Sequence, residues 1–299
     1  AALRGVAILK SGKHGILTGG SGTHLDAENL LVAEVDTGEL PALGTGVAIG
    51  DGASAAIRAT RVYRAGAVGV HAYGKGSALR MAGALVDATQ GGAQALGVGL
   101  AATNGATVQL AGSRSHGNVG GGLASMSGAA FTTTLEMHGV VADGTTAAAT
   151  GQGGMGILVH GTKASVAAQA CVLANNQVSA LTNKGGAVAL ERSVVRATRP
   201  GKYNDITLAD GLVSLGGQLS LALSVVANHQ RACVFLTDGA HGELSQSAAF
   251  GCYFGIAQQA AATVQTVGVA LFGNQQAQAS DAGLVVPPPP DLVQLAVEP

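Results

Sequence analysis

Short runs in which apolar and polar residues alternate recur along the whole chain, and small-residue turns separate them. The stretch 185–198 is a compact example, because it opens with two glycines, places Val188 and Leu190 two residues apart, and continues to a second run around Val195. A period of two puts alternate side chains on one face of a strand. The pattern therefore predicts a chain of short β-strands rather than of helices.

Aligning the chain on the apolar anchor of that second run gives eleven copies, separated by 22 to 32 residues. A helical repeat would instead place apolar residues three and four apart. Several short strands in each copy predict an all-β parallel solenoid, in which every coil buries its inward side chains against its neighbours. The anchors are Ile8, Val32, Val62, Val86, Ser115, Val141, Leu173, Val195, Val226, Phe250 and Phe272.

Two corners of the predicted coil have sequence patterns of their own. One corner pairs a variable residue with glycine, which adopts positive φ without steric cost. These pairs are Asp51-Gly52, Lys75-Gly76, Asn104-Gly105, Ser127-Gly128, His160-Gly161, Gly185-Gly186, Gly216-Gly217 and His241-Gly242. The corner after the anchor predicts a column of polar side chains that hydrogen-bond the backbone of neighbouring coils. That column is Asn118, Asp143, Asn175, Asn228 and Asn274.

With this coil length, this alternation and this asparagine corner, the chain resembles the right-handed parallel β-helix, or pectin-lyase-like, superfamily. The resemblance covers nearly the whole chain and implies a single right-handed β-helix of about eleven coils over residues 1–286. The run Pro287 to Pro290 favours a polyproline strut, so 287–299 is expected to be a Pro-rich tail or cap. Ala1 falls inside a repeat, so we expect an upstream segment that caps the first coil or carries a signal peptide.

The composition narrows the possible partners. The 16 basic and 17 acidic residues give a net charge of −1 without a dense basic run, which argues against nucleic acid as a partner. No stretch has the length and composition of a membrane helix, since the uncharged residues 118–135 are rich in Gly, Ser and Thr. Cys171, Cys233 and Cys252 are too few and too irregular for a disulfide framework or a zinc site, and we expect each to be a small buried apolar residue.

The resemblance implies catalytic patterns from which this chain departs. Pectate lyases use Asp groups for calcium and an Arg-x-Pro-x-x-Arg motif, whereas polygalacturonases use paired Asp residues with Gly-His-Gly. Here Arg196, Arg199, Pro200 and Lys202 have the residue types at a different spacing, and neither an Asp-Asp pair nor Gly-His-Gly occurs. No catalytic residue is therefore assigned.

Metal ligands are not predicted either. Five histidines precede glycine, and two of them, His160 and His241, are expected to share one column. They would lie three coils apart, about 14 Å, which is too far for one zinc ion. The run 19–26 resembles a calcium-binding nonapeptide, but its Asp is displaced and no second copy exists, so a turn is the better interpretation. We expect no cofactor.

Inserted loops follow the asparagine corner at 89–95, 144–153 and 198–207, and we expect them to flank the first strand of the next coil. In solenoids the face beside such loops is often functional. A strip of polar residues near that face is the candidate binding surface, with Tyr73 as a stacking ring for a sugar, although an ordinary solvated surface is the alternative interpretation. The candidates are His71, Tyr73, Lys75, Asn104, Thr182, Lys184, Arg199, Lys202, Tyr203, Asp205 and Asp238.

Three functions remain open. The first is a non-catalytic bacterial β-helix, secreted or on the cell surface, that acts as a scaffold or adhesion module toward polysaccharide or another surface protein. The second is a lyase or epimerase acting on uronic-acid polymers, with Tyr73 or His71 as base and Lys202 as charge neutraliser. The third is an assembly subunit that stacks on another chain through the open ends of the β-helix.

Overall fold

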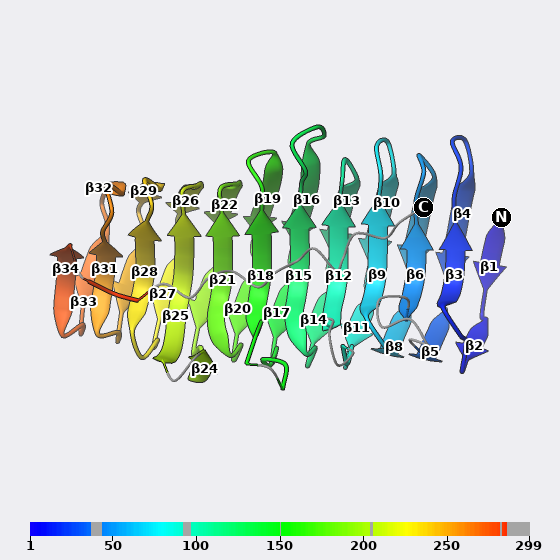
Figure 1. Ribbon diagram of the computed structural model, residues 1–299, viewed down its shortest axis with the longest axis horizontal. Helices are drawn as coiled ribbons and strands as arrows, with labels where there is room; N and C mark the ends of the chain where they lie inside the picture. Colours follow the sequence, from blue (N-terminus) through cyan, green and yellow to red (C-terminus); the bar gives the residue numbers. More distant parts are fainter. Residues whose placement is uncertain (37–43, 92–96, 150, 204–205, 282, 286–299) are drawn as a thin grey trace.

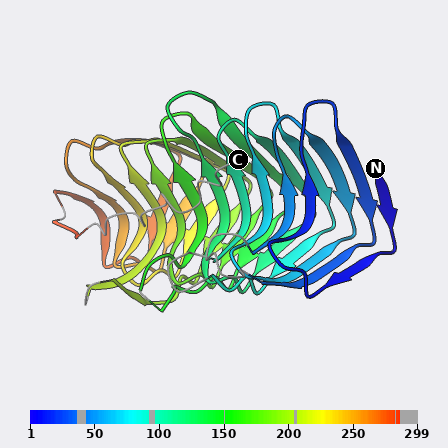
Figure 2. The ribbon, with the colours of Figure 1, turned by 45° about the vertical axis from the view of Figure 1, so that its right-hand side comes forward.

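The structure is a computed structural model that describes residues 1–36, 44–91, 97–149, 151–203, 206–281 and 283–285. Nearly all its strands pair in parallel with the strands of the preceding and following coil, which produces three long sheets. Figure 1 shows these coils following one another along the long axis, and Figure 2 shows the same succession obliquely. The predicted all-β parallel β-helix of about eleven coils is confirmed.

Each coil contributes one strand to each sheet. The first sheet contains β1 (Ala2–Arg4), β4 (His24–Glu28), β7 (Ser54–Arg58), β10 (Ala78–Ala82), β13 (Thr107–Ala111), β16 (Thr133–His138), β19 (Ala164–Gln169), β22 (Ala187–Glu191), β26 (Gln218–Ala222), β29 (His241–Ser245) and β32 (Thr263–Val267). The second contains β2 (Ala7–Leu9), β5 (Leu31–Val35), β8 (Arg61–Ala65), β11 (Leu85–Asp87), β14 (Arg114–His116), β17 (Val141–Asp143), β20 (Val172–Ala174), β23 (Val194–Arg196), β27 (Val225–Ala227), β30 (Ala248–Phe250) and β33 (Ala270–Phe272). The third contains β3 (His14–Thr18), β6 (Thr45–Ile49), β9 (Val68–Tyr73), β12 (Gly97–Thr103), β15 (Gly120–Met126), β18 (Met155–His160), β21 (Val178–Lys184), β25 (Ile206–Leu215), β28 (Ala232–Thr237), β31 (Phe254–Gln258) and β34 (Gln276–Ser280).

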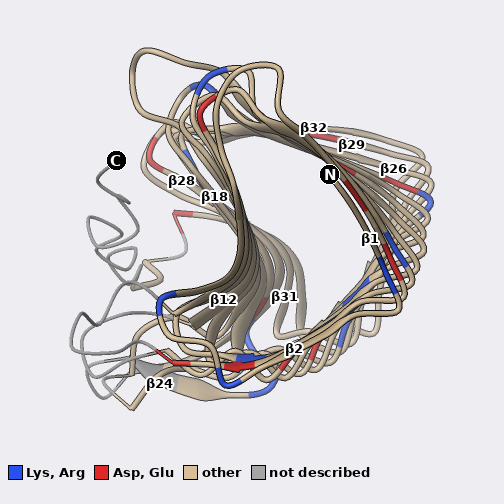
Figure 3. Cartoon of the chain, turned by 90° about the vertical axis from the view of Figure 1, so that its right-hand side faces the viewer, with Lys and Arg blue, Asp and Glu red and all other residues tan. Residues whose placement is uncertain are grey.

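The β-helix is right-handed. Seen from the N-terminal end in Figure 3, the chain passes from β1 through β2 to the third sheet and back to the first, turning clockwise as it recedes. The short strand β24 (Gly201–Tyr203) departs from this path and pairs antiparallel with β25. In the part of the chain that the structure describes, no helix is long and apolar enough to span a membrane.

The anchors of the second sheet are confirmed in eight of the eleven coils, where the predicted residues occupy one continuous inward column. In the other three coils the inward residue is the neighbour of the predicted one: Ala142 for Val141, Ala249 for Phe250 and Leu271 for Phe272. A shift of one residue moves a side chain to the other face of a strand. The bulkier neighbour therefore faces outward in each case, and the rings of the two phenylalanines stack there with centroids 4.6 Å apart.

The polar column at the corner between the second and third sheets exists, but it is not made of asparagine alone. Asn118 and Asn274 belong to it as predicted, whereas Asp143, Asn175 and Asn228 lie outside it. Asn175 and Asn228 instead occupy exposed corner positions with φ of 55° and 61°, a conformation that asparagine tolerates. The column runs through Thr89, Asn118, Thr145, Asn176, Thr198, His229, Cys252 and Asn274.

Each amide of this column joins two coils. Asn118 accepts a hydrogen bond from the backbone N–H of Thr89 at 3.0 Å, and Asn176 accepts one from Thr145 at 3.1 Å. His229 fills the same role, because its Nδ1 lies 3.4 Å from the backbone nitrogen of Thr198 and 2.9 Å from its hydroxyl. Buried backbone groups at this corner therefore find partners in the next coil.

A column of small residues at the start of the third sheet lets successive coils approach closely. At Gly99, a Cβ atom would lie 2.6 Å from the carbonyl oxygen of Gly122 and 2.5 Å from the hydroxyl of Ser115. At Gly156 the corresponding distance to the carbonyl oxygen of Ala180 is 2.6 Å. Glycine is required at Gly99 for this contact with the next coil and not for an unusual φ.

The glycine corner between the third and first sheets is confirmed in part. Four predicted pairs have positive φ at the expected glycine: Gly52, Gly76, Gly105 and Gly161. In the pairs 185–186 and 216–217 the first glycine has positive φ instead, so the turn lies one residue earlier, and Gly128 does not have positive φ. The pair at His241 is wrong, because the turn of that coil falls at Asp238 and Gly239 and His241 begins β29. His241 aligns with Gln218 and His160 with Lys184, so the two histidines do not share a column.

The prediction for the cysteines is partly wrong. Cys171 is a buried free thiol as expected, but Cys233 and Cys252 form a disulfide that joins two consecutive coils inside the β-helix. Sequence spacing gave no indication of this bond, because it depends on how the corner of one coil lies over that of the next.

The inserted loops enter at the predicted corner but lead to a different sheet. They connect the second sheet to the third, so they flank β12, β18 and β25 rather than the first sheet. Residues 287–299, predicted as a Pro-rich tail or cap, lie outside the described part of the chain.

Candidate functional site

Two of the sequence-predicted binding residues, His71 and Tyr73, lie on β9 of the third sheet. His71 is not the surface residue that we expected. Its side chain lies on the outer side of β9 but is only 1% exposed, and its Nε2 lies 3.0 Å from the hydroxyl of Thr103. Burial, with a smaller contribution from the charge of His14, lowers the pKa of His71 to about 4. The imidazole is therefore neutral at physiological pH and has no open path to a surface ligand among the described residues.

The residues next to it are more accessible. Tyr73 is half-buried, its ring centroid lies 5.1 Å from that of His71, and burial together with the charge of Asp51 raises the pKa of its phenol. Lys75 and Asn104 are exposed in the turns that join the third sheet to the first. They are the predicted candidates that occupy one corner of neighbouring coils.

The remaining candidates do not converge on this corner. Thr182 and Lys184 lie on β21, which is four strands from β9 in the sheet and hence about 19 Å away. Asp238 is in the turn after β28, and Arg199 donates from Nε to the carbonyl oxygen of Asn175 at the opposite corner. The side chains of Lys202 and Tyr203, and all of Asp205, lie outside the described part of the chain.

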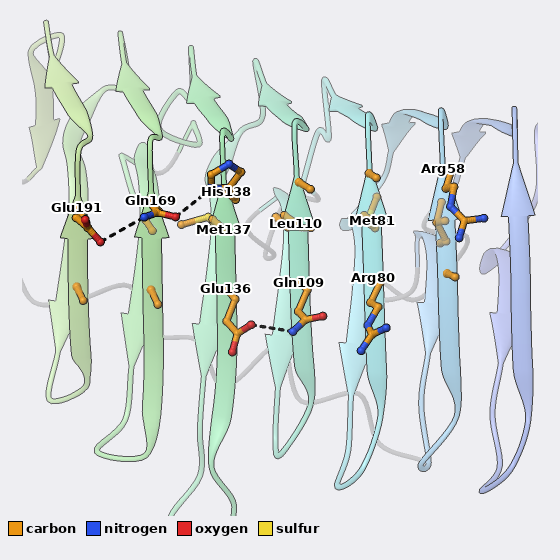
Figure 4. A pocket seen from close by; sticks show the side chains of 17 residues that line it. Arg58, Arg80, Met81, Gln109, Leu110, Glu136, Met137, His138, Gln169 and Glu191 are labelled. Carbon is orange, nitrogen blue, oxygen red and sulfur yellow. Dashed lines mark hydrogen bonds between the residues drawn. The ribbon is translucent and has the colours of Figure 1, made fainter.

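The outer face of the first sheet carries a shallow groove that the sequence analysis missed. It has a volume of about 680 Å³ and crosses six coils, from β7 to β22. Outward positions of these strands form its walls and floor, because the inward positions hold the buried core (Figure 4). The groove floor includes alanines that lie in two outward columns, Ala82 and Ala111 in one and Ala167 and Ala189 in the other, whereas β16 places the longer Glu136 and His138 at both positions. A small residue at these positions leaves room for a ligand between longer neighbours.

The walls of the groove are polar side chains that hold one another in place across coils. Gln109 donates to Glu136 at 2.8 Å, and Gln169 donates to Glu191 at 3.4 Å. His138 Nδ1 lies 3.2 Å from Oε1 of Gln169 (Figure 4). These bonds limit the rotamers of the wall and reduce the entropy cost of binding a ligand.

Charge is distributed unevenly along the groove. Arg58 and Arg80 lie toward its N-terminal end, whereas Glu136 and Glu191 lie toward its C-terminal end. Arg58 is 3.6 Å from Asp26, and both are well exposed, so that this pair is weak. Among the described residues Arg80 makes no hydrogen bond or ion pair, which leaves all its donors for solvent or a ligand.

The second sheet carries another organised set of charges, and Figure 3 marks charged residues along this sheet. Arg114 donates to both carboxylate oxygens of Asp143, at 2.9 and 2.6 Å, and Arg61 pairs with Asp87 in the same way. His116 Nδ1 lies 3.2 Å from Asp143. Burial alone would raise the pKa of Asp143, but hydrogen bonds from Arg114 and the charge of His116 outweigh burial and lower it.

A metal centre finds no support in these arrangements. In the ranges that the structure describes, no three His, Cys, Asp or Glu side chains are grouped closely enough to hold an ion.

The sequence matches no protein-family model and no curated protein. Three solved structures to which the chain is similar are β-helix proteins. They are the Dettilon tailspike protein (11% identity, TM-score 0.38), the catalytic unit of the GH87 alpha-1,3-glucanase from Streptomyces thermodiastaticus (13%, 0.42) and the A-module of the mannuronan C-5 epimerase AlgE4 from Azotobacter vinelandii (10%, 0.33). The alignments cover 87%, 96% and 90% of this chain, and 62%, 63% and 90% of the respective neighbours. The chain thus spans less than two thirds of the tailspike and of the glucanase unit.

Proposed function

We propose that the protein is a non-catalytic β-helix that binds a linear polysaccharide along the groove of its first sheet. The observation that carries the proposal is the groove itself, which runs across six coils with an alanine floor and hydrogen-bonded polar walls. Six parallel strands at about 4.8 Å spacing span about 24 Å. Such a surface suits an extended ligand rich in hydroxyl groups better than a compact one.

The buried disulfide supports a location outside the reducing cytoplasm. Cys233 and Cys252 join two coils within the core, and structural disulfides persist mainly in secreted or surface-exposed proteins. A secreted or surface-displayed scaffold or adhesion module is consistent with this chemistry. Its partner would be a polysaccharide on a neighbouring surface.

The proposal is tested by filling the groove. Ala111 lies on its floor, so Ala111→Trp should weaken binding to the polysaccharide that the native protein retains by at least about tenfold, because the indole occupies the volume of the ligand. The matched control is Ala222→Trp, which lies in the same outward column of the sheet but beyond the groove. Binding is measured by calorimetry after a screen of polysaccharides.

Two results would contradict the proposal. One is a native protein that retains no polysaccharide from a panel of neutral, uronate and sulfated polymers. The other is an Ala111→Trp variant that binds as tightly as the Ala222→Trp control while keeping its β-sheet spectrum.

A lyase or epimerase is the second candidate, and the pair of His116 with Asp143 favours it. A carboxylate 3.2 Å from Nδ1 can orient an imidazole for proton transfer at its other nitrogen, although Arg114 Nη2 also lies 3.3 Å from this Nδ1. In a lyase, an imidazole nitrogen of His116 would take the C5 proton beside the sugar carboxylate, and the electrons of that C–H bond would form the C4–C5 double bond. The C4–O glycosidic bond would break at the same time, and its oxygen would take a proton from solvent. His116 replaces His71 in this role, because His71 is buried.

Incubation with uronic-acid polymers tests this second candidate. New ultraviolet absorbance from unsaturated ends, lost in His116→Gln, would support the lyase. An epimerase would instead exchange the C5 proton with deuterated solvent. If neither signal arises across the panel, the enzymatic candidate is excluded.

A further inference from the structure

An exposed aromatic ring stands at the corner between the third and first sheets, in the loop that joins β15 to β16. Phe131 in this loop is 42% exposed. The loop folds back over the preceding coil, where a Cβ on Gly105 would lie only 2.9 Å from Cβ of Phe131. Absence of a side chain at Gly105 therefore lets the phenylalanine sit across the corner.

The loop is held from the following coil as well. Lys163 donates from its backbone nitrogen to the hydroxyl of Ser127 at 3.1 Å and from Nζ to the carbonyl oxygen of Ala130 at 3.3 Å. These contacts fix both ends of the loop around Phe131. The ring is thus presented on a supported segment rather than on a free loop tip.

Polar groups surround the ring. Lys75 Nζ lies over one face of the ring, 5.9 Å from its centroid, which leaves the other face for a sugar. Lys163 donates from Nζ to the carbonyl oxygen of Ala130, the residue before Phe131. The Asn104 side chain faces the same loop, since its Oδ1 lies 3.7 Å from where a Cβ on Gly128 would be. A flat apolar ring with ammonium and amide groups beside it matches the two kinds of surface on a sugar, its C–H face and its oxygens.

We infer that Phe131 is a stacking platform for one sugar unit of the polymer, with Lys75, Asn104 and Lys163 binding that unit's oxygens. The inference rests on the proposed function, because the same polymer would occupy the first-sheet groove. Phe131 lies in the loop five residues before Glu136 of the groove wall, at most about 18 Å away, and this offset follows the strand direction, across the long axis of the groove. A ligand of several sugar units therefore reaches both places, whereas a single ring reaches only one.

Removal of the ring is the direct test. A stacking contact of about 0.5–1.5 kcal/mol corresponds to about 2- to 12-fold in affinity, so Phe131→Ala should weaken binding of the long oligosaccharide by that factor. Phe131→Trp, which keeps an aromatic ring at this position, should bind the long oligosaccharide as tightly as the native protein does. The matched control is Phe272→Ala, which removes another exposed phenylalanine, 54% exposed, at the far end of the second sheet. Affinities for oligosaccharides of increasing length add a second readout. The loss of affinity in Phe131→Ala should vanish for a monosaccharide bound in the groove.

The outcomes separate the two proposals. If Ala111→Trp abolishes binding and Phe131→Ala equals the Phe272→Ala control, the platform is refuted and the groove stands. If the native protein binds no polysaccharide, both fail. If Phe131→Ala leaves sugar binding intact but reduces sedimentation with vesicles of anionic phospholipid, the ring is a membrane anchor and the sugar platform is refuted.

Discussion

Replacing His229 by asparagine should change how the stability of the β-helix depends on pH. His229 is 1% exposed and occupies a rung of the polar column in which Asn118 and Asn176 serve neighbouring coils. Its Nδ1 accepts from Thr198, and its Nε2 lies 3.4 Å from the carbonyl oxygen of Val195. Burial lowers the pKa of His229 to about 4, from 6.5, against a smaller opposing effect of that carbonyl.

The direction follows from proton linkage. The unfolded chain binds the proton at about pH 6.5 and the folded chain only near pH 4, so protonation favours unfolding and stability falls as pH decreases through this interval. The lowered pKa of one such histidine reduces the free energy of unfolding by about 0.2 kcal/mol at pH 7, about 2 kcal/mol at pH 5 and about 3 kcal/mol at pH 4. His71, with its pKa also lowered to about 4, adds a second contribution of the same sign.

In His229→Asn the amide keeps an acceptor for the backbone of Thr198 and cannot be protonated. At pH 7 the smaller side chain leaves a void, so the variant should be less stable than the native protein by about 1 kcal/mol. Between pH 7 and pH 5 the variant should lose about 2 kcal/mol less than the native protein, which brings the two curves together or makes them cross.

Urea unfolding, followed by far-ultraviolet circular dichroism at pH 7.5, 6.5, 5.5 and 5.0, measures this difference. His24→Asn is the control, because His24 is exposed and its replacement changes the histidine count without removing a buried ring. If native protein and His229→Asn lose stability in parallel as pH falls, the ring does not resist protonation in the folded state and the argument fails.

Two further predictions concern contacts between coils. Gly99→Ala should destabilise the protein by about 1–3 kcal/mol, because the new Cβ would meet backbone and side-chain atoms at 2.5–2.6 Å. The loss is measured as a lower urea midpoint. Gly12→Ala is the control and should leave the midpoint unchanged, because the space around Gly12 is open. Equal effects of the two substitutions would contradict the close approach. The disulfide joins Cys233 and Cys252, which are 19 residues apart in the sequence. Its reduction should lower the free energy of unfolding by about 3 kcal/mol, seen as a lower melting temperature in dithiothreitol. The melting temperature of Cys252→Ser should not change with the reductant. A melting temperature that is the same with and without reductant in the native protein would count against the bond.

The sequence was sufficient for the architecture because the inward positions repeat in chemistry as well as in spacing. Val62, Val86 and Val195 are apolar, branched and separated by whole coils, so the alternation identifies them without a structure. The predicted anchor is wrong at the three coils where a smaller residue, Ala142, Ala249 or Leu271, faces inward beside a bulkier neighbour. At Ala249 the core has room for a methyl group, and Phe250 turns outward to stack on Phe272. Residue size alone cannot separate these two faces.

The polar column shows a second physical limit. The corner needs a side-chain acceptor for a backbone N–H, and Asn118, Asn176 and His229 all supply one. Asparagine alone therefore does not identify this column, because His229 also belongs to it. The asparagine pattern also selects Asn175 and Asn228, which stand one residue earlier because asparagine tolerates positive φ. Asparagine thus has two roles at adjacent positions, as a side-chain acceptor in the column and as a residue that tolerates positive φ at the corner.

The groove on the first sheet could not be found from the sequence because its walls join residues that lie far apart in the chain. Gln109 and Glu136 become neighbours only through the register of β13 and β16, and these strands are separated along the chain by β14, β15 and the turns between them. The insertions themselves point away from the groove. They lengthen the corner between the second and third sheets, whereas the first-sheet strands β7 to β22 follow one another with five or six residues each. A regular face without insertions stays open over many coils, and this is the property that a long ligand needs. For this β-helix we therefore propose that the binding surface lies where the coil is most uniform, on the first sheet and not beside the inserted loops.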